Sequence, residues 1–447
     1  MINNFHVKNG WLGTERQGIY YFYNAVDKEF AVFKPQENLD KIIESKLKAI
    51  NIIPEPDFIC EANAAAVTLT TKCNMECPYC YVKPAGGLGV MSVEMVRNAV
   101  KALAKQTEKE LIIFGWGGEP TQNPVALIAM LEEAQKYPYI KVCLVTNGVM
   151  DSTLLNKLLK FKNLVFQISF DGLINHNKQK PLLTESNSLS SMLNSMETIS
   201  LVSRRVALRA TVTKNNVHEL NTCLLPTVSQ YTNRLMLEHL HTFNGRAVSL
   251  KDVAPSVEDY VNLVFNLIPI AEAKGIHVKV LPLDHLRAGG PNNKMNFLNI
   301  LSNGEIVVSN AIIHHLHQDF DNLQIGHLDN DNILFNKNKN ELLSKRYLDN
   351  YQMQCKDCFA RTICRGSVQR YLFISNDALN EWDNLRCQYF MAIIERWIQE
   401  LTNSIYDTIK FYDNKEGYIQ LVAPDGKIHY PMLVMENGLS LSFKQFV

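Results

Sequence analysis

The sequence predicts an α/β protein whose centre is a partial (β/α)6 barrel of the TIM type. Short runs rich in β-branched residues alternate with longer runs of helical periodicity through the middle of the chain. Gly, Asp or Asn residues bound these short runs, as they bound strands. Strands that alternate with helices form parallel sheets through right-handed crossovers. Six such units occupy about 180 residues here, whereas a complete eight-unit barrel needs about 250.

The strand-like runs come in regular succession. Helical runs stand between them, among them SVEMVRNAVKALAKQ, PVALIAMLEEAQK and STLLNKLLKF. In a parallel barrel the carboxyl ends of the strands open on one face, and that face carries the catalytic groups. The six expected strands lie at 65–71, 111–116, 141–147, 164–170, 206–213 and 234–240.

Both ends of the chain differ from the middle. The N-terminal part holds an aromatic-rich strand pair and then a helical segment near 38–50. The C-terminal part has turn signals at Asp425-Gly426 and Asn437-Gly438, which indicate a three-stranded meander. The expected segments are a β-rich appendage at 1–62, the barrel at 63–290, a cysteine-bearing unit at 291–395 and the meander at 396–447.

Composition narrows the range of partners. The 447 residues include 45 basic and 45 acidic side chains, and this balance argues against a nucleic-acid or anionic-membrane partner. The N-terminus shows no secretory signal, and no apolar run reaches the roughly 18 residues that span a bilayer. We therefore expect a cytoplasmic protein with reduced cysteines. Its ten cysteines then indicate metal ligands, catalytic groups or core residues rather than disulfides.

The first cysteine cluster follows the first expected barrel strand. Cys73, Cys77 and Cys80 have the spacing C-x3-C-x2-C. Three thiolates on one loop can hold three irons of a [4Fe–4S] cluster, which normally takes four cysteines. The fourth iron would keep an open position, the mark of a reactive metal site. A zinc loop and unrelated core cysteines are the alternatives.

With its spacing and with Tyr79 before the third cysteine, this loop resembles the radical S-adenosylmethionine (SAM) superfamily. The resemblance implies that the open iron binds the amino and carboxylate groups of SAM. Electron transfer then cleaves SAM to methionine and a 5′-deoxyadenosyl radical, which abstracts hydrogen from a substrate.

Further candidate SAM contacts follow successive strands. In the family, the glycine-rich motif after the second strand meets the SAM amino group, although a tight turn would have the same sequence. A hydroxyl and a carboxylate after the fourth strand could bind ribose, and an inward arginine on the fifth needs an anion such as the SAM carboxylate. These residues are Gly117, Gly118, Glu119, Pro120, Thr146, Asn147, Ser169, Asp171 and Arg209.

The second cysteine cluster lies beyond the barrel. It comprises Cys355, Cys358, Cys364 and Cys387, with the local pattern C-x2-C-x5-C. Four thiolates suit zinc as well as an iron–sulfur cluster, and spacing alone does not separate the two.

This segment resembles the SPASM or twitch extension of peptide-modifying radical SAM enzymes, in the unit at 291–395. Gly304 matches the glycine of the full SPASM pattern. The segment nevertheless departs from that pattern, because Ser309 and Val368 stand where two of its cysteines are expected. The resemblance then implies one SAM cluster and one fully ligated auxiliary [4Fe–4S] cluster.

The resemblance implies an enzyme that modifies a ribosomally made precursor peptide. We expect hydrogen abstraction from an unactivated carbon and then a thioether or carbon–carbon cross-link, with flavodoxin or ferredoxin as the electron donor; peptide epimerisation stays open. Oxidation to formylglycine, as by sulfatase-maturing relatives, is weakened because Asn310 replaces the presumed base. A zinc-binding interaction protein is the alternative outside enzymology.

Several residues have no assigned role. For residues 1–62 we favour a barrel-capping role over binding of a leader peptide. The catalytic base is unknown. Glu238, His239 and His241 are expected near the barrel mouth, whereas the histidines after residue 313 are expected on a solvated loop. The remaining candidates are the pair His176-Asn177, the cluster His314, His315 and His317, and the leftover cysteines Cys60, Cys143 and Cys223.

Overall fold

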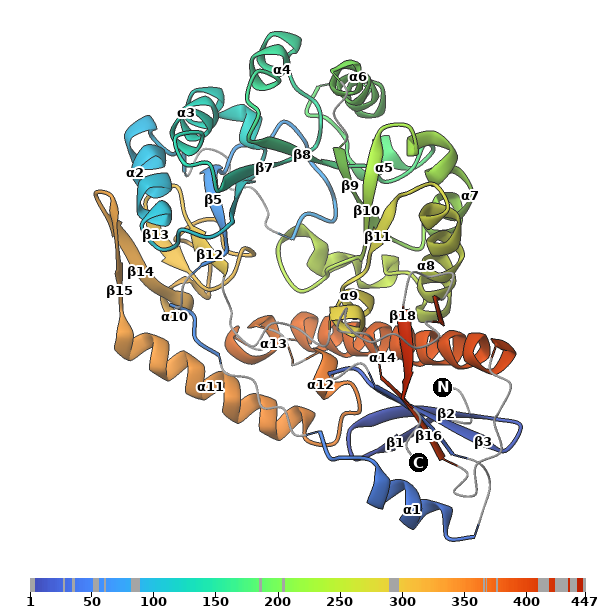
Figure 1. Cartoon of the computed structure of the whole chain (residues 1–447). Coiled ribbons are helices and arrows are strands. Elements are labelled where there is room, and N and C mark those ends of the chain that lie inside the picture. The colour runs from blue at the N-terminus through green and yellow to red at the C-terminus, as the bar shows by residue number, and fades with distance from the viewer. Residues whose placement is uncertain are drawn as a thin grey trace.

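The computed structural model (Figure 1) confirms the predicted mixed α/β architecture with a parallel barrel sheet. In its described part, no helix is both long and apolar enough to cross a bilayer. The structure describes residues 5–26, 29–33, 37–50, 56–59, 62–81, 89–184, 187–202, 206–288, 297–364, 366, 368–374, 377–408, 418–422, 433–434 and 440–444.

Six parallel strands form the barrel in chain order, as the alternation of strand and helix signals predicted. Two short strands extend the sheet in parallel, β11 beside β10 and β12 beside β5. The strands are β5 (Ala64–Thr70), β6 (Leu111–Gly117), β7 (Ile140–Thr146), β8 (Leu164–Ser169), β9 (Val206–Val212), β10 (Thr232–His239), β11 (His277–Lys279) and β12 (Phe297–Ile300).

Helices cover the outside of the barrel (Figure 1). Several begin at a side-chain cap, because Ser, Asn or Asp before the first turn accepts a backbone N–H that the helix leaves unpaired; Ser92 and Asp151 do so for α2 and α4. The elements are α2 (Val93–Ala104), η1 (Pro120–Gln122), α3 (Pro124–Ala134), α4 (Ser152–Leu158), α5 (His176–Gln179), α6 (Ser188–Leu201), α7 (Val217–Val228), η2 (Gly245–Val253), α8 (Val257–Glu272) and α9 (Leu281–Ala288).

The unit expected at 291–395 is continuous with the barrel. Its first strand, β12, lies in the barrel sheet and leads into an antiparallel extension, and its last helix, α14, runs past the expected boundary after residue 395. The elements are β13 (Glu305–Val307), α10 (Phe320–Leu323), β14 (Gln324–Asp329), β15 (Asn332–Phe335), α11 (Lys337–Cys355), α12 (Arg361–Cys364), α13 (Val368–Leu372) and α14 (Asp377–Thr408).

The two ends of the chain, which were expected as separate units, share one antiparallel sheet in the order β1-β2-β3-β4-β16-β18-β17 (Figure 1). A meander would place β17 between its neighbours, but β18 pairs with both β16 and β17. The elements are β1 (Phe5–Lys8), β2 (Trp11–Arg16), β3 (Ile19–Asn24), β4 (Glu29–Phe33), α1 (Leu39–Lys46), β16 (Tyr418–Val422), β17 (Leu433–Val434) and β18 (Ser440–Lys444).

Helix α14 joins this terminal sheet to the rest of the molecule. The buried Trp397 packs its ring edge against Tyr23 of β3, with 5.1 Å between the ring centroids. Nearby, the Arg16 guanidinium donates to the Asn403 side chain at 2.9 Å. Because this contact buries two large aromatic rings, it is a major link between the sheet and the helix.

We expect Trp397→Ala to lower the free energy of unfolding by about 3–5 kcal/mol, since it leaves a cavity at a buried aromatic contact. A shift of the urea midpoint, followed by circular dichroism, measures this loss. Glu400→Ala on the same helix removes a half-exposed side chain and should change the midpoint little. Equal midpoints for the two variants would contradict the proposed link.

Candidate functional site

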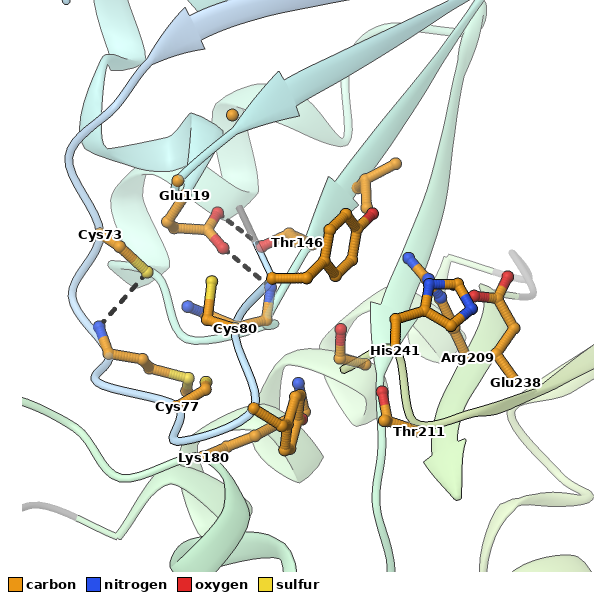
Figure 2. Close-up of a pocket in the computed structure, with 18 of the residues that line it drawn as sticks. Cys73, Cys77, Cys80, Glu119, Thr146, Lys180, Arg209, Thr211, Glu238 and His241 are labelled. Atoms are coloured by element: carbon orange, nitrogen blue, oxygen red, sulfur yellow. Dashed lines mark hydrogen bonds and ion pairs between the residues drawn. The ribbon is translucent and has the colours of Figure 1, made fainter. Parts of the chain in front are cut away.

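A cavity at the carboxyl end of the barrel strands brings together most of the residues that the sequence singled out. It encloses about 970 Å³ of space not filled by protein atoms, part of it open to solvent. Figure 2 shows the three cysteines with Glu119 and Thr146 on one side, and Arg209, Glu238 and His241 on the other. The candidates that line it are Cys73, Cys77, Cys80, Tyr79, Gly117, Gly118, Glu119, Thr146, Asn147, Ser169, Arg209, Glu238, His239 and His241.

The two glycines after β6 position the cysteine loop. The N–H of Gly118 donates to the Thr70 carbonyl at 2.9 Å, and the N–H of Glu119 donates to the Lys72 carbonyl at 2.8 Å. A Cβ on Gly117 would collide with the Thr70 oxygen, and one on Gly118 with the Lys72 oxygen; Gly117 also has φ of 128°. Glycine is therefore required where β6 meets the loop.

Asn74, a residue that the sequence analysis missed, ties the same loop to the end of β7. Its side-chain carbonyl accepts a hydrogen bond from the Asn147 amide at 2.7 Å, and its own amide donates to the Val149 carbonyl at 3.1 Å. Asn147 in turn accepts from the Val149 N–H at 2.9 Å. This network holds Asn147 beside the cysteines.

Asp171 is fully buried and anchors the loop through Tyr79, whose hydroxyl donates to it. The carboxylate also accepts from the Thr211 N–H at 3.0 Å and lies 3.9 Å from the Lys180 ammonium. Both carboxylate oxygens are thus engaged within the chain, and Asp171 does not line the cavity, whereas Ser169 does. The structure therefore places Ser169, and not Asp171, where a ligand hydroxyl could reach it.

Lys180 was not singled out from the sequence. It is buried, lines the cavity and lies over the Tyr79 ring, with 5.3 Å from its ammonium to the centroid. No motif marks this residue, because it follows the short helix α5 and reaches the cysteine loop only through the fold.

Glu119 lies almost completely buried at the base of the cavity. Its carboxylate accepts from the Thr146 hydroxyl at 2.7 Å, from the Asn147 N–H at 2.8 Å and from the Thr121 hydroxyl at 2.8 Å. Burial nevertheless raises the pKa of this carboxyl above its ordinary value. Pro120, the next residue, begins η1 and does not line the cavity.

Arg209 and Glu238 face each other across the far wall as an ion pair. Burial favours the neutral form of Glu238, but the charge and hydrogen bond of Arg209, together with other nearby positive charge such as Lys279, outweigh burial and lower the pKa of the carboxyl. His241 lies beside them, and burial lowers its pKa to about 4, so its ring is neutral at pH 7.

Two charged side chains of this cavity could match the groups of SAM. No ion pair joins the buried Glu119 to any residue that the structure describes, so it can receive an ammonium group. The partly buried Arg209 is paired with Glu238, but its buried Nε has no hydrogen-bond partner in the described part of the chain, so it can also donate to a carboxylate. A buried polar group without a partner is costly, and a zwitterionic ligand would supply a partner to each of the two side chains.

Burial favours the neutral thiol form of Cys73 and Cys77, so a metal must displace their protons. Burial raises the pKa of Cys73 to about 12, with the negative Glu119 adding to the effect, and burial raises that of Cys77 to about 11. Metal binding displaces thiol protons. An iron–sulfur cluster would therefore supply the positive charge that these thiolates need.

The four cysteines of the second cluster line one small pocket beyond the barrel. Cys355 ends α11, Cys358 lies in the turn before α12, Cys364 ends α12, and Cys387 lies on α14. They come from three helices and one turn, so the fold brings together cysteines that are distant in the sequence, from Cys355 to Cys387.

The remaining candidates lie elsewhere. His317 contacts the Asn244 amide at 2.8 Å and lies, like His314 and His315, away from the cavity. Cys143 is buried in β7, and Cys223 lies on α7. Cys60 falls outside the residues that the structure describes.

His176 and Asn177 have structural partners. The ring of His176 accepts a hydrogen bond from the Asp171 N–H at 3.2 Å, and Asn177 accepts from the Ser188 hydroxyl at 2.9 Å. Both therefore brace the segment that follows β8.

Comparison with known proteins agrees with this arrangement. Residues 67–188 match the model of the Radical SAM superfamily. Over 278 residues the chain is 23% identical to the radical SAM cyclopropyl synthase TigE of Paramaledivibacter caminithermalis. That match covers 56% of this chain and 55% of the relative, so the chain spans about half the length of the protein it resembles.

Solved structures show the same fold. The structure of anSMEcpe with bound AdoMet has a TM-score of 0.59 at 18% identity and covers 76% of this chain and 99% of that chain. Its complex with AdoMet and the Kp18Cys peptide has a TM-score of 0.60 at the same identity and coverage. Residues 67–188 thus form a radical SAM domain, which confirms the family predicted from the cysteine loop. Members of this superfamily use a [4Fe–4S] cluster and SAM.

We expect Gly118→Ala to displace the cysteine loop, because its Cβ would collide with the Lys72 carbonyl. Iron bound at the three-cysteine site should fall severalfold after anaerobic reconstitution, while the far-ultraviolet circular dichroism stays near that of the parent protein.

The matched control is Gly115→Ala on the same strand, β6. Its Cβ would meet the flexible end of Met130 at 3.1 Å, a contact that can relax. Iron loading should therefore be nearly unchanged. Equal iron contents in the two variants would show that the glycine contact does not position the loop.

Proposed function

We propose that this chain, whose residues 67–188 form a radical SAM domain, is a peptide-modifying enzyme that abstracts hydrogen from one residue of a ribosomally made precursor. The observation that carries the proposal is the shared cavity of Cys73, Cys77 and Cys80 with the incompletely matched charges of Glu119 and Arg209. The four cysteines of the second pocket would hold one auxiliary cluster.

Each part of the cavity would have a defined task. The three cysteines would hold the first cluster, Glu119 would face the SAM ammonium, and Arg209 would face its carboxylate. When bound, the reduced cluster and SAM supply a 5′-deoxyadenosyl radical. The hydroxyl groups of Thr146 and Ser169 also line this cavity and can donate to polar groups of a ligand.

A second cavity inside the barrel adjoins the first and would receive the substrate side chain. Residues such as Trp116, Arg209 and His241 line both cavities. Aromatic side chains, Phe114 and Phe297 among them, line the inner one together with the Arg209–Glu238 ion pair and other polar groups. The aromatic walls would shield a reactive carbon of the substrate from water.

The relatives support a peptide substrate and a new bond. A structure of anSMEcpe contains a bound peptide together with AdoMet. TigE is named a cyclopropyl synthase, and a cyclopropyl group requires a carbon–carbon bond. A thioether or carbon–carbon cross-link is therefore the product that we propose, with a reduced electron carrier such as flavodoxin or ferredoxin as partner.

The alternatives carry less support. Formylglycine formation would need a base where Asn310 stands, and the Asn310 carbonyl accepts a hydrogen bond from the Trp116 indole at 3.2 Å. Peptide epimerisation remains a second candidate for the same cavity. A zinc-binding interaction protein would not account for the match of residues 67–188 to the Radical SAM superfamily.

We expect Cys77→Ala to reduce the formation of 5′-deoxyadenosine from SAM, with dithionite as reductant, to background. Loss of one thiolate prevents assembly of the cluster at this loop. Cys223→Ala removes a cysteine on α7 outside both pockets and should retain the parent rate. Retained SAM cleavage in Cys77→Ala would refute the assignment of this loop.

Iron and sulfide analysis tests the number of clusters. The anaerobically reconstituted protein should hold about eight irons and eight sulfides per chain, four of each for every cubane. A variant with alanine at Cys355, Cys358, Cys364 and Cys387 should hold about four of each. Stoichiometric zinc without iron in the parent protein would contradict the proposed function.

A further inference from the structure

The second cysteine pocket contains two arginines that contact the cysteine sulfurs. Arg370 lies on α13 and Arg386 on α14, and both line the pocket together with the four cysteines. Nothing in the sequence pattern marks these residues. Their position matters because a thiolate that ligates iron still accepts hydrogen bonds.

Arg370 donates to Cys387. The distance from its Nη1 to the Cys387 sulfur is 2.9 Å, and the same nitrogen lies 2.7 Å from a carboxylate oxygen of Asp383. Asp383 is only 5% exposed, and its second oxygen has no hydrogen-bond partner among the described residues. The carboxylate therefore fixes the guanidinium against the sulfur.

Arg386 donates to Cys364. Its two terminal nitrogens lie 3.6 and 3.7 Å from the Cys364 sulfur, and the guanidinium carbon lies 4.7 Å from the centroid of Phe390. The residue is 8% exposed. An aromatic ring on one side and the pocket on the other leave little water to screen this charge.

The other two sulfurs also have donors. The Tyr371 hydroxyl lies 2.8 Å from the Cys355 sulfur. Cys358 interacts with the backbone N–H of Ala360. Gly366 has φ of 82°, and any Cβ there would collide with the Tyr371 ring. Each of the four sulfurs thus has a hydrogen-bond donor, and two of these donors carry a full positive charge.

We propose that Arg370 and Arg386 raise the reduction potential of the auxiliary cluster held by these four cysteines. The inference rests on the proposed function, which places a cluster in this pocket. Reduction adds a negative charge to a group whose four thiolates already make it anionic, so nearby cations stabilise the reduced state more than the oxidised one. The buried guanidinium of Arg386 does this strongly because screening is weak, and the partly buried Arg370 adds its charge directly at a sulfur. A raised potential suits a cluster that accepts an electron.

The test isolates the auxiliary cluster in full-length protein that carries Cys73→Ala, Cys77→Ala and Cys80→Ala. Electron paramagnetic resonance during a potentiometric titration gives its midpoint potential. Arg386→Met and Arg370→Met should each make reduction less favourable by on the order of tenfold, which is about 59 mV for a one-electron couple.

Three variants separate charge from local packing. Arg386→Lys keeps the charge and should lie between the parent protein and Arg386→Met. Tyr371→Phe removes one neutral donor and should give a smaller fall in potential. Arg396→Met removes a half-exposed arginine of α14 that pairs with Glu400, and it should leave the potential unchanged.

The outcomes distinguish this inference from the proposed function. If the isolated pocket of the parent background binds no [4Fe–4S] cluster, the assignment of an auxiliary cluster fails. If the cluster assembles but both methionine variants keep the parental potential, the arginines have only a structural role and the inference fails. If Arg386→Met loses the cluster, Arg370→Met decides, because parental iron with an unchanged potential in that variant would overturn the proposal.

Discussion

The contact between the end of β6 and the cysteine loop determines the geometry of the barrel mouth. Backbone N–H groups of Gly118 and Glu119 bond the carbonyls of Thr70 and Lys72, and no side chain fits between the two segments. Because Glu119 follows directly, the same contact fixes a buried carboxylate, which then holds Thr146 and Asn147. One backbone contact thus orients the cysteines, the acid and the end of the next strand together.

Helix α14 connects the parts of the molecule that would otherwise be separate. Trp397 packs on the terminal sheet, and Cys387 and Arg386 complete the second cysteine pocket. Toward the barrel, Trp382 lies 5.4 Å from His241, measured between ring centroids. The charge of Arg386 also lowers the pKa of His241, after burial and alongside Arg209, so the two sites share one electrostatic environment. Helix α14 therefore contributes side chains to the second cysteine pocket and also contacts His241 of the first cavity.

The sequence predicted the barrel because strand and helix signals are local, and the candidate SAM contacts lie on or just after successive strands. Pairing between distant segments is not local, so the joining of β4 and β16 in one sheet could not be foreseen. The same limit explains why Asn74 and Lys180 were missed, since neither belongs to a motif and both act through contacts with other strands. Asp171 followed the motif but is turned inward, because burying Tyr79 required an acceptor.

The two cysteine sites solve the same electrostatic problem in different ways. Three thiolates and Glu119 would leave the first site strongly anionic, and only Lys180 and the partly matched Arg209 lie near it in the described cavity. Its ligand must therefore bring positive charge, and SAM does so with its ammonium and sulfonium groups. The second site would hold its proposed cluster with one cysteine for every iron, so the cations that balance its thiolates would come from the chain itself. Arg370 and Arg386 would meet that need, because each donates to a cysteine sulfur of the second site.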